Sequence, residues 1–497
     1  MQISSLFAGA KLTDVQSQQS MDHSAIVAAT LEWQQLLADL DASRLVLWAD
    51  TSVEWVLLDL ACLAANQLLV PLPLFASTSQ LLHVLRSVGP EYLLTDRPVS
   101  NDVIDSCDLH FRGRCRGFYL YQSTAQLQQQ RLAVPAGTQK ITFTSGSTGQ
   151  PKGVCLSAQT QLQTAQSLVE RIAPTLSAVS QPRHLCLLPL SLLLENIAGV
   201  YAPLLAGGEV LLMADAGRGF AGSSLVDPQQ LLALIEQTQP NSLILVPELL
   251  QLLVQAALKG WQVPASLKFI AVGGAKVAVD TLRQAAALKI PVYQGYGLSE
   301  CGSVVALCSV DAAHASDEAL HSVGQPLAHL QVRLEQDEIY VKTPFLGYMG
   351  QSDVPASEWV ATGDLGQWSS TGDLQILGRR NNLLISSFGR NISPEWVESV
   401  LMQTGLIQQA VLCGDAKPYC VALLFAPAAV SDQQLVDYLQ WLNPQLPDYA
   451  RIAQFHRLSA PFSQHDATLT SNGRPRRAVI AERYQAQIAA LYPECAY

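Results

Sequence analysis

Short apolar segments alternate with segments of helical periodicity in the N-terminal half of the chain. Residues 44–50 form an apolar run, and residues 52–67 carry apolar side chains at the three- and four-residue spacing of a helix. An extended segment at 68–75, a helix at 77–89 and a second extended segment at 91–96 follow in the same order. Strands that alternate with helices indicate βαβ units and a parallel sheet.

The same pattern returns further along the chain and then changes. Residues 225–239 and 249–260 have helical spacing, and each segment precedes an apolar, strand-like run. Beyond Val323 the segments become shorter and alternate between apolar and polar residues, as in 331–344, with turn signals between them. This alternation predicts a small antiparallel sheet that is partly exposed to solvent.

A further change comes at residues 378–401. There a turn with two asparagines precedes a short strand, a loop and a helix that has Ser393 as its N-cap and Pro394 at its first position. Beyond this helix, two apolar runs and another helical segment are typical of a small α+β domain. We therefore predict an α/β fold with a large N-terminal domain of parallel-rich αβ layers plus a small antiparallel sheet (1–377), a hinge (378–381) and a small mobile α+β domain (382–497).

The composition excludes several classes of protein. The 497 residues are too many for one hydrophobic core, and 49% of them are hydrophobic while 14% are charged. The two longest apolar stretches, 185–194 and 197–208, are too short to span a bilayer and fit strands buried on both faces of a parallel sheet. The formal net charge of −11 argues against nucleic acid as a partner.

The cysteines and the first residues bear on the compartment. The 10 cysteines are scattered, without a CxxC pair or the spacing of zinc ligands. The first residues lack a basic region followed by an apolar core, so we expect no signal peptide. Together these features predict reduced thiols and a cytoplasmic protein without a transmembrane segment, and they leave the oligomeric state open.

The most specific stretch is ITFTSGSTGQPKGV, at residues 141–154. An apolar run ends at Phe143, six hydroxyl-bearing or glycine residues follow it, and Lys152 lies shortly after them. Backbone N–H groups and hydroxyls packed this densely can surround a phosphate, and a lysine supplies positive charge. The stretch is not a Walker P-loop, because no Gly-Lys-[Ser/Thr] triplet closes it.

This stretch resembles the phosphate loop of the adenylate-forming superfamily, which includes acyl-CoA synthetases, adenylation domains of peptide synthetases and luciferases. Further elements of that family follow in the family's order: YQGYGLSE (293–300), VGQP (323–326), EWVATGDLG (358–366), the hinge segment GRRNNLLISSFGRNISPEWVES (378–399) and LTSNGRPRR (469–477). The resemblance spans nearly the whole chain, and the chain is most similar to bacterial long-chain fatty acyl-CoA synthetases and acyl-AMP ligases.

The resemblance implies a role for each residue of these motifs. The residues that would bind the β- and γ-phosphates of ATP are Thr144, Ser145, Gly146, Ser147, Thr148, Gly149 and Lys152. Those that would surround the adenine, the ribose and the reacting carboxylate are Gly273, Gly274, Ala275, Tyr296, Gly297, Ser299, Asp364 and Arg379. Glu300 and Thr148 would hold Mg²⁺, Arg390 would face phosphate after the small domain turns, and Asn381 would occupy the hinge position.

The implied chemistry has two steps. A carboxylate first attacks the α-phosphorus of ATP and expels pyrophosphate, and catalysis of this step is mostly positioning and electrostatic stabilisation. A thiol then attacks the acyl-adenylate from another side, which requires the small domain to rotate about its hinge.

The segment LPLSLLLE (188–195) bears on the identity of the acid. It resembles the corresponding pattern of long-chain acyl-CoA synthetases, with Leu192 in place of a histidine. In the longer stretch at 189–208 no charge precedes Glu195 that could pair with the ammonium group of an amino acid, although this whole stretch could equally be a core helix. We therefore expect a fatty or other apolar carboxylic acid as the substrate.

The acceptor and one catalytic residue leave alternatives open. Coenzyme A is the expected thiol, an acyl carrier protein is the alternative, and β-lactone-forming relatives use no thiol. The family normally has a lysine at the position of Arg474, and that lysine bridges the carboxylate, the ribose and the α-phosphate. Arginine keeps the charge but is not a simple substitute for an ammonium, so a non-catalytic homologue that binds acyl groups or nucleotide is a further alternative.

Overall fold

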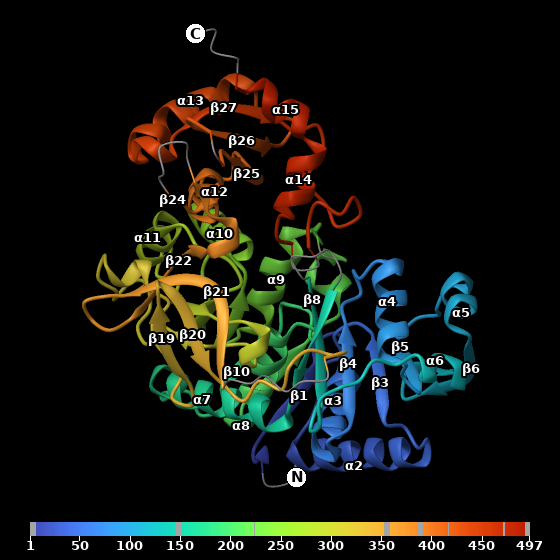
Figure 1. Ribbon diagram of the computed structural model, residues 1–497. Helices are drawn as coiled ribbons and strands as arrows, with labels where there is room; N and C mark the ends of the chain where they lie inside the picture. Colours follow the sequence, from blue (N-terminus) through green and yellow to red (C-terminus); the bar gives the residue numbers. More distant parts are fainter. Residues whose placement is uncertain are drawn as a thin grey trace.

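The computed structural model describes residues 6–145, 151–222, 224–351, 358–385, 391–415, 417–470 and 473–492. Figure 1 shows a large N-terminal domain, coloured from blue to yellow-orange, with a smaller orange-red C-terminal domain above it. The predicted α/β fold with a small α+β C-terminal domain is confirmed.

The first large sheet has seven strands in the order β6-β7-β5-β3-β4-β8-β9. Its central strands β5, β3, β4 and β8 are parallel, and β7, β6 and β9 are antiparallel to their neighbours. The bounds are β3 (Arg44–Trp48), β4 (Leu68–Leu72), β5 (Tyr92–Thr95), β6 (Leu109–Cys115), β7 (Phe118–Ser123), β8 (Lys140–Ser145) and β9 (Pro151–Leu156). The predicted strand–helix alternation over residues 44–96 is therefore correct, and the hairpin of β8 and β9 carries the phosphate-loop motif.

The second large sheet has nine strands in the order β18-β17-β16-β15-β14-β10-β11-β1-β2. The strands are β1 (Lys11–Asp14), β2 (Gln19–Met21), β10 (Arg183–Leu185), β11 (Glu209–Leu212), β14 (Ser242–Leu245), β15 (Phe269–Val272), β16 (Val292–Tyr296), β17 (Ala306–Leu307) and β18 (Gln325–Pro326). Because β14, β15 and β16 are parallel, their carboxyl ends meet at one edge of the sheet, where ligands bind in open α/β sheets.

Helices lie between and around these two sheets (Figure 1). Their bounds are α2 (His23–Asp39), α3 (Val53–Ala65), α4 (Thr78–Val88), α5 (Asn101–Cys107), α6 (Ala125–Gln129), α7 (Ala158–Leu176), α8 (Ala202–Leu205), α9 (Pro228–Thr238), α10 (Pro247–Leu258) and α11 (Val279–Ala287). The α3 helix begins after Ser52, whose hydroxyl caps the Trp55 amide, and it is buried over residues 55–63. One hydrophobic core joins α3 to strands of both sheets.

The apolar run at 197–208 is helical as far as Leu205, so the strand expected from its composition is wrong and the core-helix alternative is correct. A π-helix spans Leu194–Tyr201 and continues directly into α8. Its wide turn places two buried polar side chains opposite partners: Glu195 accepts from the Leu188 amide, and Asn196 donates to Asp59. A buried polar side chain requires such a partner. The helix gives one to each of these two side chains, whereas a central strand would have pointed one of the two side chains into apolar surroundings.

The predicted antiparallel sheet is present and has four strands in the order β19-β20-β21-β22. They span β19 (Gln331–Glu335), β20 (Glu338–Lys342), β21 (Trp359–Trp368) and β22 (Leu374–Arg379). Two short hairpins complete the small sheets, β12 (Phe220–Ala221) with β13 (Ser224–Leu225) and β23 (Leu384–Ile385) with β24 (Asn391–Ile392).

The C-terminal domain is built on a three-stranded sheet in the order β25-β26-β27, with one antiparallel and one parallel pair. Its elements are α12 (Pro394–Met402), β25 (Gln409–Cys413), β26 (Cys420–Phe425), α13 (Asp432–Leu442), β27 (Ile452–Arg457), α14 (Arg477–Arg483) and α15 (Gln485–Ala490). Ser393 is the N-cap of α12 and Pro394 its first residue, as predicted. Within the described residues, no helix has both the length and the apolar character needed to cross a bilayer.

Candidate active site

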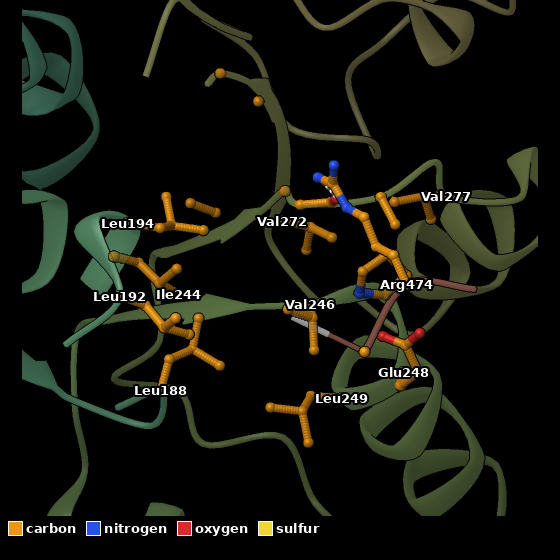
Figure 2. Close-up of a pocket in the computed structure, with 18 of the residues that line it drawn as sticks. Leu188, Leu192, Leu194, Ile244, Val246, Glu248, Leu249, Val272, Val277 and Arg474 are labelled. Carbon is orange, nitrogen blue, oxygen red and sulfur yellow. Dashed lines mark hydrogen bonds between the residues drawn. The ribbon is translucent and has the colours of Figure 1, made fainter. Parts of the chain in front are cut away.

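A cavity of about 2140 Å³ lies between the two domains. Its walls include the carboxyl ends of β14, β15 and β16, the strands β21 and β22, and the loop that precedes α14. Figure 2 shows Arg474, from that loop, among side chains of the N-terminal domain. The cavity therefore has contributions from segments far apart in the sequence.

Most of the predicted site residues meet in this one cavity. Those that line it are Thr144, Lys152, Gly273, Gly274, Ala275, Tyr296, Gly297, Ser299, Glu300, Asp364, Arg379 and Arg474. Gly146, Ser147, Thr148, Gly149 and Arg390 lie outside the described residues, and only the backbone is described at Ser145 and Asn381.

Asp364 is the centre of a polar cluster on the antiparallel sheet. The register of β21 and β22 places it directly opposite Arg379, whose Nε lies 2.8 Å from Asp364 Oδ1. The hydroxyl of Tyr296, at the end of β16, donates to Asp364 Oδ2 at 2.7 Å. An ionised carboxylate offers about four lone-pair positions, so two acceptor positions of Asp364 are left for a ligand.

Tyr296 acts as a neutral donor in this cluster. Burial is the main cause that raises the pKa of its hydroxyl well above the ordinary value, and the charge of Asp364 adds to it. The hydroxyl therefore keeps its proton at neutral pH, and its hydrogen bond holds Asp364 in one orientation.

Two of the predicted nucleotide-binding residues are glycines that the backbone requires. Gly274 follows β15 with φ +89, a conformation that favours glycine. At Gly297 an added Cβ would lie 1.7 Å from the backbone oxygen of Ser303, so any side chain there would force the chain apart. The motif positions after β15 and β16 are thus glycine for reasons of backbone conformation and close approach.

Arg474 reaches into the cavity from a tight turn in the C-terminal domain. Gly473 has φ +74, and the Arg474 amide donates to the Thr470 hydroxyl at 3.0 Å, so the turn fixes the arginine backbone. The guanidinium donates through Nη2 to the carbonyl oxygen of Gly274. The large and the small domain therefore meet at Arg474.

The electrostatic surroundings of Arg474 are mixed. Burial between the domains is the main cause that lowers the pKa of its guanidinium, and the neighbouring charge of Arg379 lowers it further. Asp364 and Glu395 act in the opposite direction. Arginine stays charged in proteins, so Arg474 is a fixed cation beside the carboxylate cluster, although the open cavity leaves it accessible to solvent.

Tyr348, which no sequence motif predicts, lies between two predicted phosphate-site residues, Glu300 and Lys152. Tyr348 donates to Glu300 Oε1 at 2.9 Å, and the Nζ of Lys152 lies 5.7 Å from the centre of the Tyr348 ring. Tyr348 forms an isolated antiparallel bridge with Val154, on the strand that carries Lys152. Burial and the charge of Glu300 raise the pKa of Tyr348, so it too remains a neutral donor.

The hinge segment follows the antiparallel sheet directly. A 3₁₀ turn spans Arg380–Asn382 after β22, and Arg380 pairs with the buried Glu338 at 2.8 Å. Asn382 donates to Glu395 of α12 at 2.6 Å. Polar contacts thus anchor the turn on both sides, to the large domain through Arg380 and to α12 through Asn382.

Apolar side chains cover another part of the cavity wall (Figure 2). Those labelled are Leu188, Leu192, Leu194, Ile244, Val246, Leu249, Val272 and Val277. Leu192, the residue at which the motif resemblance predicts a histidine, is among them. The segment at 188–195 is therefore both a pocket wall and the start of the buried π-helix.

Two family models match the chain. The model described as AMP-binding enzyme matches residues 19–346, and the model described as AMP-binding enzyme C-terminal domain matches residues 381–496. The chain belongs to the AMP-binding enzyme family. The resemblance seen in the motifs is thereby confirmed, as is the prediction of an enzyme of the adenylate-forming class.

The AMP-binding enzymes most similar to this chain include ligases for different acids. A 2-succinylbenzoate–CoA ligase of Enterococcus faecalis is 29% identical over 67% of this chain and 67% of its own length. A long-chain-fatty-acid–CoA ligase of Mycobacterium bovis is 25% identical over 90% of this chain and 88% of its own length.

Solved structures agree on the fold. The O-succinylbenzoate coenzyme A synthetase of Bacillus subtilis, in complex with ATP and magnesium ion, superposes with a TM-score of 0.72 at 24% identity over 94% of this chain and 95% of that chain. This likeness shows that the fold of this chain, with its large and small domains, is that of the synthetase structure.

Proposed function

We propose that this AMP-binding enzyme activates an apolar carboxylic acid, with a fatty acid as the first choice, to an acyl-adenylate at the expense of ATP and then transfers the acyl group to coenzyme A. The observation that carries the proposal is the continuity of one cavity, in which the Asp364 cluster, Arg474 and the apolar wall at Leu192 all take part. A nucleotide and an acid bound in the same cavity are close enough to react.

The polar end of the cavity suits a nucleotide. Asp364 would accept both ribose hydroxyls through its free acceptor positions, with Arg379 and Tyr296 holding it in place. The adenine would lie against Gly273, Gly274, Ala275 and Gly297. The phosphates would be bound by the motif residues from Thr144 to Gly149 and by Lys152.

Glu300 fits the role of a magnesium ligand. One of its oxygens, Oε1, accepts from Tyr348, and no partner is recorded for Oε2 within the described chain. A carboxylate oxygen is the ligand that Mg²⁺ prefers, and the ion would supply charge neutralisation at the phosphates. Thr148 is proposed as the second ligand on the motif alone.

Arg474 is the proposed catalytic cation of the first step. The acid carboxylate attacks the α-phosphorus in line, and negative charge develops on the phosphate oxygens while pyrophosphate leaves. A guanidinium held at Gly274 and beside Asp364 can form a forked contact with such an oxyanion.

Residues 1–377 and 382–497 are proposed as the two domains that rearrange between the steps, with the hinge at 378–381. The 3₁₀ turn at Arg380–Asn382 directly follows β22 and leads into the C-terminal segments. Rotation there would withdraw Arg474 from the cavity and let a thiol approach the acyl-adenylate. Coenzyme A is preferred as the acceptor because the similar named ligases are CoA ligases; a carrier protein has no such support.

The test is acid-dependent exchange of pyrophosphate into ATP, measured across fatty, aryl and amino acids and followed by product analysis with coenzyme A and with a carrier protein. Exchange with apolar acids and an acyl-CoA product support the proposal. Asp364→Asn serves as the matched control, because it keeps the shape of the side chain and removes the charge. Exchange only with amino acids would contradict the proposed substrate class.

A non-catalytic binding protein is the second candidate, and Arg474 is the feature that favours it. Such a protein would bind ATP or an acyl chain in a thermal-shift or calorimetric titration and would give no exchange with any acid. An acyl-CoA product from any acid would dismiss this candidate.

A further inference from the structure

Glu248 is a carboxylate in the wall of the cavity that the proposed mechanism does not use. It lies in the first turn of α10, directly after the strand β14 that contributes Ile244 to the apolar wall. Figure 2 shows its side chain extending from α10 toward the pocket that Val246 and Leu249 also line. An acidic side chain therefore stands beside apolar ones at the edge where the acid is proposed to bind.

No other described residue pairs with this carboxylate. Its recorded hydrogen bond comes from its own backbone amide. The cation labelled in Figure 2 is Arg474, and its guanidinium donates to the carbonyl oxygen of Gly274, not to Glu248. Glu248 is exposed to the open cavity, and the surrounding cavity walls nevertheless raise the pKa of its carboxyl by desolvation, which the backbone hydrogen bond offsets only in part.

The cavity is open to water, which solvates Glu248 while no substrate is bound. A ligand that fills the apolar wall displaces that water. A carboxylate that loses its water without gaining a partner is strongly destabilised, and a site built around a buried hydrogen-bonding group rejects analogues that leave the group unpaired. A bound acid that carries a donor avoids this cost, since no other described residue supplies one.

We propose that Glu248 determines substrate choice, by selecting carboxylic acids whose apolar body carries a hydrogen-bond donor, an ammonium or a hydroxyl group, at the position that faces the first turn of α10. This inference rests on the proposed function and narrows its substrate class. The segment before Glu195 offers no charge for an amine, and Glu248 supplies one from a different element of the same cavity.

The experiment uses acids in matched pairs that differ by one donor group. Octanoate is compared with 3-hydroxyoctanoate, 3-aminooctanoate and 8-aminooctanoate, and benzoate with its three aminobenzoates, each by kcat/KM in pyrophosphate exchange with the full chain. We expect at least one donor-bearing acid to be preferred by about 10- to 100-fold, the range of one hydrogen bond to a charged group. Glu248→Leu should abolish that preference by slowing only the donor-bearing acid.

Two further variants make the result specific. Glu248→Gln keeps an acceptor oxygen without the charge, so it should retain preference for a hydroxyl and lose preference for an ammonium. Glu236→Leu makes the same change on the exposed face of α9, outside the cavity lining, and should leave every ratio unchanged. Preference for the donor-free acid in every pair, or equal ratios in wild type and Glu248→Leu, would overturn the inference.

The outcome can be separated from failure of the proposed function. If no acid gives exchange, the same acids are coupled to adenosine as acyl-sulfamates and their Kd is measured by calorimetry on wild type and Glu248→Leu. A 10- to 100-fold difference within a pair that Glu248→Leu removes would support the role of Glu248 even in a non-catalytic protein, by the same hydrogen-bond range. Equal Kd values within every pair would overturn it.

Discussion

Replacing Arg474 by alanine should slow formation of the acyl-adenylate far more than transfer of the acyl group to the thiol. The guanidinium binds the Gly274 carbonyl oxygen and lies in the field of Asp364 and Arg379, so it is already oriented before charge develops at the α-phosphate. Removing one preorganised donor of this kind costs about 2.7–4 kcal/mol of transition-state stabilisation, or a factor of about 10²–10³ in kcat.

The same substitution should leave folding stability nearly unchanged. Burial and the neighbouring Arg379 lower the pKa of Arg474, so its charge is not a source of folding free energy at this position. We expect the free energy of unfolding to change by about 0.5 kcal/mol or less in urea. A large kinetic effect with a small effect on stability distinguishes a catalytic cation from a structural one.

Two assays measure the half-reactions separately: pyrophosphate exchange for the first step, and transfer from supplied acyl-adenylate to coenzyme A for the second. Arg474→Lys restores the residue usual in the family and should recover most of the exchange rate. Arg483→Ala is the control, because Arg483 pairs with Asp466 at 2.8 Å on the surface of the same domain. If Arg474→Ala slows both half-reactions equally, or neither, Arg474 does not act as the adenylation cation.

Three further substitutions test the cavity around this residue. Asp364→Ala should weaken ATP binding by about tenfold or more, as measured by calorimetry. It should also lower the free energy of unfolding in urea by about 1–3 kcal/mol, because a tyrosine hydroxyl and a guanidinium lose their acceptor. Gly297→Ala should give little folded protein, since its Cβ would lie 1.7 Å from a backbone oxygen. Gly273→Ala, whose Cβ would lie 3.5 Å from the nearest atom, should fold and bind ATP poorly. A soluble, fully active Gly297→Ala would contradict this. Burial lowers the pKa of Lys276 from its usual 10.5, so the charged form lowers the free energy of unfolding at neutral pH, and this loss vanishes as the pH rises toward the usual value. Lys276→Met should therefore be at least as stable as wild type at neutral pH. If the difference in the free energy of unfolding between Lys276→Met and wild type does not shrink toward about pH 10, the assignment is refuted.

The regular elements were predictable because their signals are local. The apolar run at 44–50 contains β3, and the helical spacing at 52–67 contains α3 with its Ser52 cap. Strands buried on both faces read as continuous apolar runs, and helices against them show a repeat close to 3.6 residues. From its sequence, the run at 197–208 stays open between a buried strand and a core helix, because the two share the same composition.

The site was predictable only where a motif carries its own spacing. Asp364 and Arg379 belong to motifs, and the register of β21 and β22 then brings them together. Tyr348 belongs to none, and its contact with Glu300 depends on a bridge between residues 154 and 348 that no local pattern encodes. Glu248 was missed for a similar reason: its segment predicts a strand and a helix, and only the assembled cavity shows that its carboxylate has no partner.

The arrangement of charge in the cavity explains why an arginine can stand where relatives have a lysine. A lysine would bring one compact cation that needs neighbours to orient it, whereas Arg474 is oriented by the backbone carbonyl of Gly274 and by the field of Asp364. Arg379 already adds a positive charge at the same carboxylate, so the cluster would retain a cation if the proposed movement of the small domain withdrew Arg474. The second step would then take place beside a nucleotide that is still bound through Asp364, with the acyl end left to the apolar wall and to Glu248. Nucleotide retention and acid activation would thus depend on different residues, Asp364 and Arg474, which is why substitutions of these two should give separable effects.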